Sequence, residues 1–194
     1  MKPFIVEFTG TPEAGKTTCI NNVLEIFQEH GTKTEYIQES AELLPSHIQK
    51  KTFEASYWMC NNTIETIKTR LENNNSDIIF IDRGLCDAGF YSHLYSNNFS
   101  SFELKKYNEL VNDNLALSPD LLMVFTVDPK IAINRRGGEG RIVTKDYVTN
   151  YNMQLLNYFK KHSNPKSTFV DTTVLNEKDV ALNTLEIIQS KLIN

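Results

Sequence analysis

The segment Gly10–Thr17, which reads GTPEAGKT, constrains this chain more than any other part of its sequence. It matches the pattern G-x-x-x-x-G-K-[ST] in full. The apolar run Phe4–Thr9 precedes it, and residues with helical periodicity follow over Lys16–His30. In this context the backbone N–H groups turn toward a phosphate, and the helix N-terminus adds its positive dipole end. A ligand-free turn between strand and helix is the alternative, but the full pattern favours a phosphate-binding loop.

The loop residues have expected roles in binding ATP. Lys16 is expected to reach the β- and γ-phosphates, and the hydroxyl of Thr17 can ligate Mg²⁺. The predicted cofactor-binding residues of the loop are Gly10, Thr11, Pro12, Glu13, Ala14, Gly15, Lys16, Thr17 and Thr18.

The rest of the chain alternates short apolar runs with longer stretches of helical periodicity. The apolar runs predict strands at Phe4–Thr9, Thr34–Gln38, Ile78–Asp82, Leu121–Val127 and Thr168–Asp171. Helices are predicted at Lys16–His30, Ala88–Tyr95, Phe102–Leu117, Tyr147–Lys161 and Val180–Leu192, with one or two more in Leu43–Asn73 and a helix start at Asp128-Pro129. This alternation predicts an α/β fold, a five-stranded, mostly parallel sheet flanked by helices. No linker or repeat divides the chain, so we expect a single domain over residues 1–194.

Composition excludes several other classes of protein. With 40% hydrophobic and 10% aromatic residues the chain can form a core, which excludes wholesale disorder. Its apolar runs fall far short of the roughly 20 residues that span a membrane, and no secretory signal is recognisable. A net charge of −4 gives no basic surface for nucleic acid. The three cysteines, Cys19, Cys60 and Cys86, show no paired spacing, so we expect free thiols and a cytoplasmic location.

Beside the Thr17 hydroxyl, a second metal-side group is expected, an acidic residue at the end of another strand. The apolar run Ile78–Ile81 ends in Asp82, which is the best candidate in the chain. Asp120 and Asp128 flank another predicted strand and are the rivals. Thr17 and Asp82 are therefore the predicted metal ligands.

The arginines are few and clustered. The chain has 20 lysines and arginines together, and of its five arginines three, Arg135, Arg136 and Arg141, fall within seven residues. Glycines between them leave the segment free to close, and mobile arginines neutralise the charge that spreads over a transferring phosphoryl group. An exposed basic turn is the alternative.

With these residues in place, the sequence resembles the thymidylate-kinase-like group of P-loop kinases, which includes deoxynucleoside kinases and small ATPases of the ribosylnicotinamide-kinase type. Four features match in order: the phosphate loop, Glu39 after the second predicted strand, Asp82-Arg83 after the third, and the arginine-rich segment after the fourth. The resemblance covers essentially the whole chain. It implies a P-loop kinase with a short arginine-containing lid over about residues 134–145.

The resemblance also implies roles for the matching residues. Asp82 would help to hold Mg²⁺, Arg83 would bind the acceptor or the transferring phosphate, and Arg136 and Arg141 would close over the phosphates of ATP. Glu39 would be the general base that removes a proton from a sugar hydroxyl, with a surface or helix-capping glutamate as the alternative. The predicted catalytic residues are thus Lys16, Glu39, Arg83, Arg136 and Arg141.

Departures from the thymidylate-kinase pattern bear on the acceptor. Thymidylate kinases carry an arginine immediately before the glutamate and another in the next helix, where this chain has Gln38 and Tyr57–Asn61. A phosphorylated acceptor needs cationic partners. The sequence therefore favours a nucleoside or nucleoside-like hydroxyl, although Lys50 and Lys51 could substitute as point charges.

Asp87 and several aromatic residues are further candidates for the acceptor side. The spacing from Asp82-Arg83 to Asp87 resembles the ribosylnicotinamide-kinase type, which implies that Asp87 reads acceptor hydroxyls; a helix N-cap is the alternative. Aromatic residues could form a slot for a planar base or belong to the core: Phe53, Tyr57, Trp58, Phe90 and Tyr91. The predicted acceptor residues are Glu39, Trp58, Arg83 and Asp87.

Three functions remain open at this stage. The first is phosphoryl transfer from Mg·ATP to a small-molecule acceptor, a nucleoside or similar hydroxyl compound. The second is a nucleoside monophosphate kinase of the thymidylate type. The third is a nucleotide-binding regulatory module with slow ATPase activity. Relatives also imply a possible homodimer.

Overall fold

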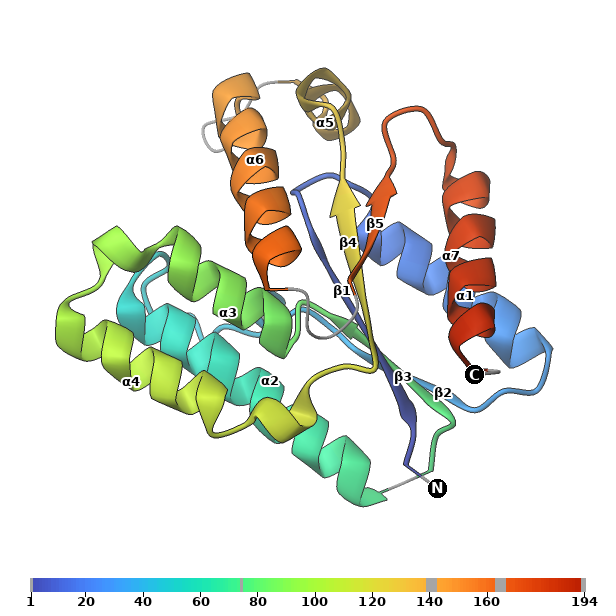
Figure 1. The fold of residues 1–194 in the computed structure, drawn as a ribbon, viewed down its shortest axis with the longest axis horizontal. Helices are drawn as coiled ribbons and strands as arrows, with labels where there is room; N and C mark the ends of the chain where they lie inside the picture. The colour runs from blue at the N-terminus through green and yellow to red at the C-terminus, as the bar shows by residue number, and fades with distance from the viewer. Residues whose placement is uncertain (1, 74, 139–142, 163–166, 193–194) are drawn as a thin grey trace.

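The computed structural model describes residues 2–73, 75–138, 143–162 and 167–192. Five strands form one sheet in the order β2-β3-β1-β4-β5, and all four neighbouring pairs are parallel (Figure 1). The strands are β1 (Phe4–Gly10), β2 (Thr34–Ile37), β3 (Ile78–Asp82), β4 (Leu121–Thr126) and β5 (Ser167–Asp171). The predicted α/β fold is confirmed, and the carboxyl ends of its parallel strands share one edge of the sheet.

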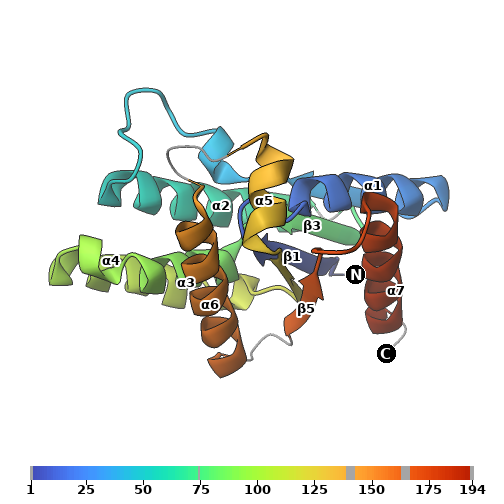
Figure 2. The same cartoon turned by 90° about the horizontal axis from the view of Figure 1, so that it is seen from above.

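Helices cover both faces of this sheet. The described residues form the α-helices α1 (Lys16–Glu29), α2 (Phe53–Asn73), α3 (Leu85–Leu94), α4 (Ser101–Asn112), α5 (Pro129–Arg136), α6 (Lys145–Lys161) and α7 (Glu177–Leu192). In the two views of Figures 1 and 2, α1 and α7 lie side by side on one face. The other face carries α2, α3 and α6, with α4 packed against α2 and α3.

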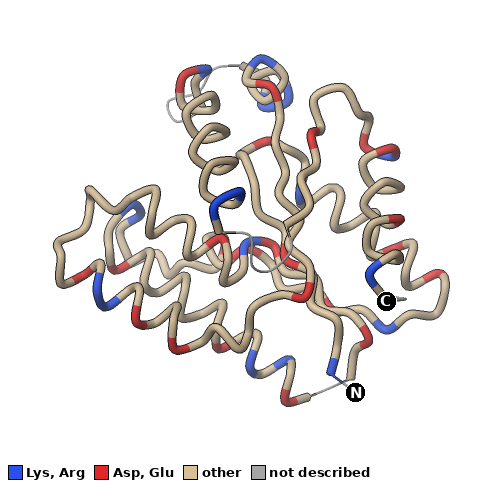
Figure 3. Tube along the Cα trace, in the orientation of Figure 1, with Lys and Arg blue, Asp and Glu red and all other residues tan. Residues whose placement is uncertain are grey.

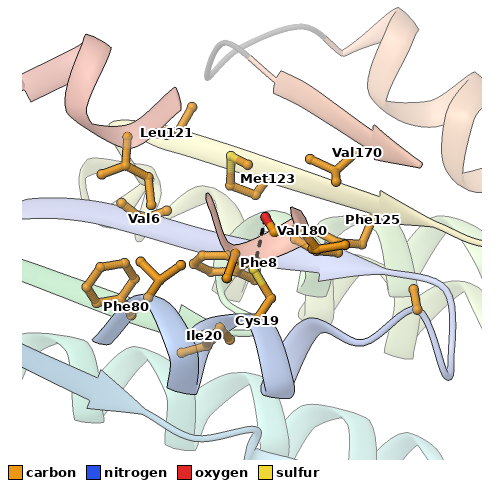
Figure 4. Close-up of a cluster of buried hydrophobic side chains, with 14 of the residues drawn as sticks. Val6, Phe8, Cys19, Ile20, Phe80, Leu121, Met123, Phe125, Val170 and Val180 are labelled. Atoms are coloured by element: carbon orange, nitrogen blue, oxygen red, sulfur yellow. Dashed lines mark hydrogen bonds between the residues drawn. The ribbon is translucent and has the colours of Figure 1, made fainter. Parts of the chain in front are cut away.

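Side chains along β1 point alternately to the two faces of the sheet, so the strand contributes apolar residues to the core on both sides. Val6 and Phe8 belong to the cluster that joins the sheet to α1 and α7, where they contact residues such as Met123 (Figure 4). Ile5 points to the opposite face, in a cluster with Ile67 of α2. Burying each of these side chains contributes about 1.5–3 kcal/mol, so the central strand is held firmly from both sides.

Local contacts set where two of the helices begin. α2 starts at Phe53, within the stretch Leu43–Asn73 in which the sequence predicts one or two helices, because Thr52 Oγ1 accepts a hydrogen bond from the N–H of Ala55 and sets the helix start there. α3 starts at Leu85, three residues earlier than predicted, with Gly84 at the N-cap position. Asp87 therefore lies inside the first turn, and the alternative interpretation of this residue as an N-cap is wrong.

Two other boundaries follow local chemistry. The side chain of Asp128 accepts a hydrogen bond from the N–H of Lys130 at 2.8 Å, and Pro129 opens α5 as predicted. α4 ends at Asn112, and the remainder of the predicted helix is a turn and a 3₁₀ segment at Leu115–Leu117. No helix within the described residues is long and apolar enough to cross a membrane.

Candidate functional site

The phosphate loop joins the end of β1 to α1. At Gly10 (φ 148°) an added Cβ would lie 2.2 Å from the carbonyl oxygen of Phe125, so the close approach of β4 requires glycine here. Gly15 (φ 80°) is left-handed where α1 begins, and Glu13 adopts the same region at φ 62°. The tight turn holds Lys16 in a buried position, with Nζ 3.5 Å from the carbonyl oxygen of Thr11.

Lys16 lies in an environment that disfavours its charge. Burial, together with the nearby Arg83, lowers the pKa of Lys16 to about 8. The carboxylates of Asp82, Glu39 and Asp87 act in the opposite direction. An ammonium group held in this way gains most from an incoming phosphate, which would supply the missing negative charge.

The two predicted metal ligands are in direct contact. The hydroxyl of Thr17 donates to Oδ2 of Asp82 at 2.7 Å, while Oδ1 of Asp82 is buried and has no hydrogen-bond partner among the described residues. A hydroxyl and an orphaned carboxylate oxygen fit Mg²⁺, which binds few protein oxygens and completes its octahedron with water and phosphate oxygens. The rivals serve other purposes, since Asp120 accepts from the N–H of Ile5 at 2.8 Å and Asp128 caps α5.

Arg83 contacts both carboxylates of the site and the phosphate loop. It follows β3 in a left-handed conformation (φ 61°), an uncommon one for a residue other than glycine. Its Nε lies 3.1 Å from Oε1 of Glu39, its Nη1 lies 3.1 Å from Oδ1 of Asp87, and its Nη2 donates to the carbonyl of Gly10 at 3.2 Å. Burial alone would lower the pKa of Arg83, but Asp87 and Glu39 outweigh it and keep the guanidinium charged.

A cavity of about 80 Å³ opens beside Arg83. Its charged lining residues are Glu39, Arg83 and Asp87, so the structure brings three of the four predicted acceptor residues together. The other residues that line it come mainly from α2, α3 and α4: Ser40, Ala41, Ser56, Met59, Cys60, Thr63, Gly84, Ala88, Tyr91 and Tyr107. Among the described lining residues Arg83 is the one cation, and Lys50 and Lys51 do not reach the cavity.

Trp58, the fourth predicted acceptor residue, does not line this cavity. α2 presents Ser56, Met59 and Thr63, which are spaced for one helical face, and Trp58 lies off that face. Phe90 is fully buried in the core between α3 and α6. Of the proposed aromatic slot only Tyr91 lines the cavity, and Tyr107, from α4, is an aromatic residue that sequence reasoning missed.

Glu39 follows β2 and lines the cavity beside Arg83. Burial raises the pKa of its carboxyl, and Arg83 partly offsets this effect. A carboxylate with a raised pKa is a better base at neutral pH than an exposed one. Its alternative interpretation as a capping residue is not supported, because Glu39 makes no side-chain capping hydrogen bond to the 3₁₀ segment Ser40–Glu42.

A larger cavity of about 500 Å³ lies on the other side of the phosphate loop. It is lined by residues of the loop, α1, α5 and the β5–α7 connection: Glu13, Ala14, Gly15, Thr18, Cys19, Arg135, Thr172, Leu175, Asn176, Glu177 and Val180. Its position next to Gly15 and Thr18 suits the base and sugar of a nucleotide whose phosphates occupy the loop.

Arg135 and Arg136 have different contacts, although they are adjacent. Arg135 donates to the carbonyl of Glu13 at 3.2 Å and, from Nη2, to the carbonyl of Thr172 at 2.7 Å, which ties α5 to both walls of the larger cavity. Arg136 forms an ion pair with Oε1 of Glu13 at 3.1 Å. The assignment of Arg136 to the phosphates stays a prediction, Arg141 lies outside the described residues, and the contacts of Arg135 were not foreseen. Figure 3 shows the basic residues of α5 gathered at the end of the molecule where β4 and β5 finish.

One further buried acid supports the acceptor side. Glu7 of β1 is fully buried and accepts hydrogen bonds from the backbone N–H groups of Cys86 (3.0 Å) and Asp87 (2.7 Å). Burial raises the pKa of Glu7 to about 7, although these two N–H groups act against the increase. The signal in the sequence was a lone charged residue within an apolar strand.

A glycine-rich loop with a buried lysine, placed at the carboxyl edge of a parallel sheet and facing a threonine–aspartate pair, defines a P-loop nucleotide-binding protein. The chain belongs to the family described as an AAA domain, whose model matches residues 5–176. No curated protein sequence matches the chain significantly.

Solved structures show the same architecture. Thymidylate kinase from Candida albicans, in a study titled for its broad substrate specificity and a novel structural element, matches with a TM-score of 0.67. The match covers 97% of this chain and 92% of that one at 18% sequence identity. The fold is therefore the thymidylate-kinase-like P-loop fold that the sequence motifs implied.

Proposed function

We propose that this protein is an ATP- and Mg²⁺-dependent kinase that transfers a phosphoryl group to a hydroxyl of a small, unphosphorylated acceptor of the nucleoside class. The observation that carries the proposal is the arrangement of Glu39, Arg83 and Asp87 in a cavity next to the phosphate loop. Two carboxylates face one guanidinium there, so the cavity has no surplus positive charge for an acceptor phosphate.

The roles of the residues follow from their positions. Lys16 and the loop amides would bind the β- and γ-phosphates, and Thr17 and Asp82 would hold Mg²⁺. The ion would neutralise charge on the phosphates during transfer. Glu39 would accept the proton of the acceptor hydroxyl, while Asp87 hydrogen-bonds a second acceptor group and Arg83 stabilises the transferring phosphoryl group.

The decisive experiment is ADP release against a panel of nucleosides, nucleoside monophosphates and other hydroxyl compounds. A nucleoside that stimulates turnover above the water-driven background supports the proposal, and the absence of any stimulating acceptor contradicts it. Glu39→Gln is expected to slow phosphorylation roughly 10²–10⁴-fold, because the general base is lost while the shape of the side chain is kept. Glu42→Gln, an exposed glutamate three residues away, is the matched control.

Phosphorylation of a nucleoside monophosphate is the second candidate, favoured by the likeness to the fold of a thymidylate kinase. It would need a cation for the acceptor phosphate. Among the arginines that the structure describes, the one outside α5 and the acceptor cavity is Arg70, which pairs with Glu35 of β2 at 3.4 Å and does not line the cavity. Conversion of an added nucleoside monophosphate other than AMP to its own diphosphate, beyond the ADP that comes from ATP, would establish this alternative. A nucleotide-binding module with slow ATPase activity is the third candidate, and it predicts turnover that Glu39→Gln leaves unchanged.

A further inference from the structure

Three consecutive residues where β1 ends make hydrogen bonds to three different side chains. The hydroxyl of Thr9 donates to Asp87, and the carbonyl of Gly10 accepts from Arg83. The hydroxyl of Thr11 donates to Oδ1 of Asn152 on α6. The first two contacts lead to the acceptor cavity, whereas the third leads to a helix that no motif connects with the site.

Asn152 uses both ends of its side-chain amide. While Oδ1 accepts from Thr11, Nδ2 donates to the carbonyl of Val127 at 2.8 Å. Val127 directly precedes Asp128, which caps α5. Thr11 is fully buried, so its hydroxyl would lose its partner if this amide were removed. Asn152 therefore fixes the phosphate loop against the end of β4.

Tyr151, the residue before Asn152, reaches the other half of the site. It is 2% exposed, and its ring packs edge-on against Phe90 with centroids 5.4 Å apart. Its hydroxyl accepts a hydrogen bond from Nη1 of Arg83 at 3.4 Å. Since the packing restricts the ring, the phenol oxygen has a defined place beside the guanidinium that also contacts Glu39 and Asp87. Adjacent residues of one helix thus touch the nucleotide side and the acceptor side.

We propose that Asn152 is a positioning residue for the phosphate loop, and that Tyr151 and Asn152 together couple nucleotide binding to acceptor binding through α6. The coupling half of this inference rests on the proposed function, while the phosphate-loop half needs only a nucleotide. A nucleotide that orders the loop also fixes the Thr11–Asn152 contact, and the same rigid helix then holds Tyr151 against Arg83. Coupling between two binding sites is reciprocal, so an acceptor strengthens nucleotide binding by the same factor.

The phosphate-loop half is tested with a non-hydrolysable ATP analogue and Mg²⁺ by titration calorimetry. Asn152→Ala is expected to weaken analogue binding roughly tenfold, because it leaves two buried polar groups without partners. Asn150→Ala, an exposed position on the same helix, is expected to bind as the wild type does. Thr11→Val should reproduce the loss and Thr11→Ser should restore binding, so the test stands even if Asn152→Ala does not fold.

The double variant separates positioning from general destabilisation. If Thr11→Val and Asn152→Ala remove the same contact, their combination weakens binding no more than either change alone. Fully additive losses, or wild-type affinity in Asn152→Ala, would overturn the assignment of Asn152.

The coupling half is tested with an acceptor that supports turnover. The quantity measured is the ratio of acceptor Kd without the analogue to acceptor Kd with it. Tyr151→Phe keeps the ring and removes the hydroxyl, so we expect unchanged analogue binding and a ratio reduced roughly 3–10-fold. An equal ratio in wild type and variant contradicts the coupling. If no acceptor supports turnover, the proposed function fails, whereas the result for Asn152 is unaffected.

Discussion

Nε of Arg83 lies 3.1 Å from Oε1 of Glu39, so the residue proposed to stabilise the phosphoryl group also holds the proposed base. The pair is largely buried, with 11% and 30% of the two side chains exposed, and the interaction is therefore only weakly screened by salt. Any change in one partner is expected to affect the other.

Arg83→Lys is expected to lower kcat/KM for the acceptor roughly 10²–10³-fold. Lysine keeps the charge, but it cannot contact Glu39, Asp87 and the carbonyl of Gly10 at once. Steady-state kinetics measure the loss, and titration with an ATP analogue should show little change in nucleotide affinity. Arg70→Lys, which alters an ion pair outside the acceptor cavity, is the control. A loss confined to nucleotide affinity would contradict the assignment of Arg83 to the transfer step.

The affinity for triphosphate is expected to fall as the pH rises through about 8. The pKa of Lys16 is lowered to about 8 in the free protein, and phosphate binds best to the charged form. Above that pH, binding must also take up a proton, which costs up to about tenfold in affinity per pH unit. Calorimetry across pH 7–9.5 in buffers of different ionisation enthalpy should detect the uptake. A flat profile would mean that Lys16 is already fully charged.

Glu7 is expected to make stability depend on pH between about 4.5 and 7. Its pKa is raised from 4.5 to about 7, so in this range the folded chain binds a proton that the unfolded chain has released. This group therefore lowers the free energy of unfolding as the pH rises from 4.5 to 7, and has no further effect above that range. Urea unfolding of the wild type and Glu7→Gln should show this slope only in the wild type. Equal slopes would contradict the expectation.

Other ionisable groups face Glu7 and could contribute to the pH dependence of unfolding. They are Asp87 and the thiol of Cys86 on α3, and the hydroxyl of Tyr158 on α6. Burial raises the pKa of both Cys86 and Tyr158, so neither titrates in the window. Asp87→Asn, measured alongside, removes the negative charge that faces Glu7.

Gly10→Ala is expected to destabilise the protein far more than Gly31→Ala. Both glycines have positive φ, at 148° and 78°, so both substitutions add backbone strain of about 1–2 kcal/mol. At Gly31 nothing lies within 4 Å of an added Cβ, whereas at Gly10 the carbonyl oxygen of Phe125 is 2.2 Å away. The overlap is expected to add about 1–3 kcal/mol. Chemical unfolding of both variants measures the difference, and equal losses would show that the strands can separate.

Patterns in the sequence predicted those parts of the fold that depend on local periodicity. The strands, the phosphate loop and the capped start of α5 at Asp128 are set by neighbouring residues, and the structure has them within a few positions. The start of α3 could not be predicted, because it depends on Glu7, which lies about 80 residues away. Contacts between distant segments leave no periodic signal.

In the candidate site, too, motifs predict some of the residues and miss those whose position depends on distant contacts. Thr17 and Asp82 were paired from motifs, and the structure brings them together. The sequence predicts Trp58 and Arg136 as site residues. In the structure their neighbours line the cavities instead: Met59 lines the cavity beside Arg83, and Arg135 lines the larger cavity. Which of two adjacent residues on a helix faces a cavity depends on how the helix is rotated in the fold. Asn152 and Tyr151 had no recognisable motif at all.

The position of α7 in the chain has a consequence for when the larger cavity forms during synthesis. The family match ends at residue 176, yet α7 follows it, packs on α1 and contributes Val180 both to the core and to the larger cavity. The thiol of Cys19, just beyond the phosphate loop, contacts the hydroxyl of Thr184 on α7 at 3.3 Å. Figure 4 shows Val180 of the same helix beside Cys19. The loop leaves the ribosome early, but one wall of the larger cavity is synthesised more than 160 residues later. The larger cavity is therefore complete only after α7 has been synthesised and has packed on α1.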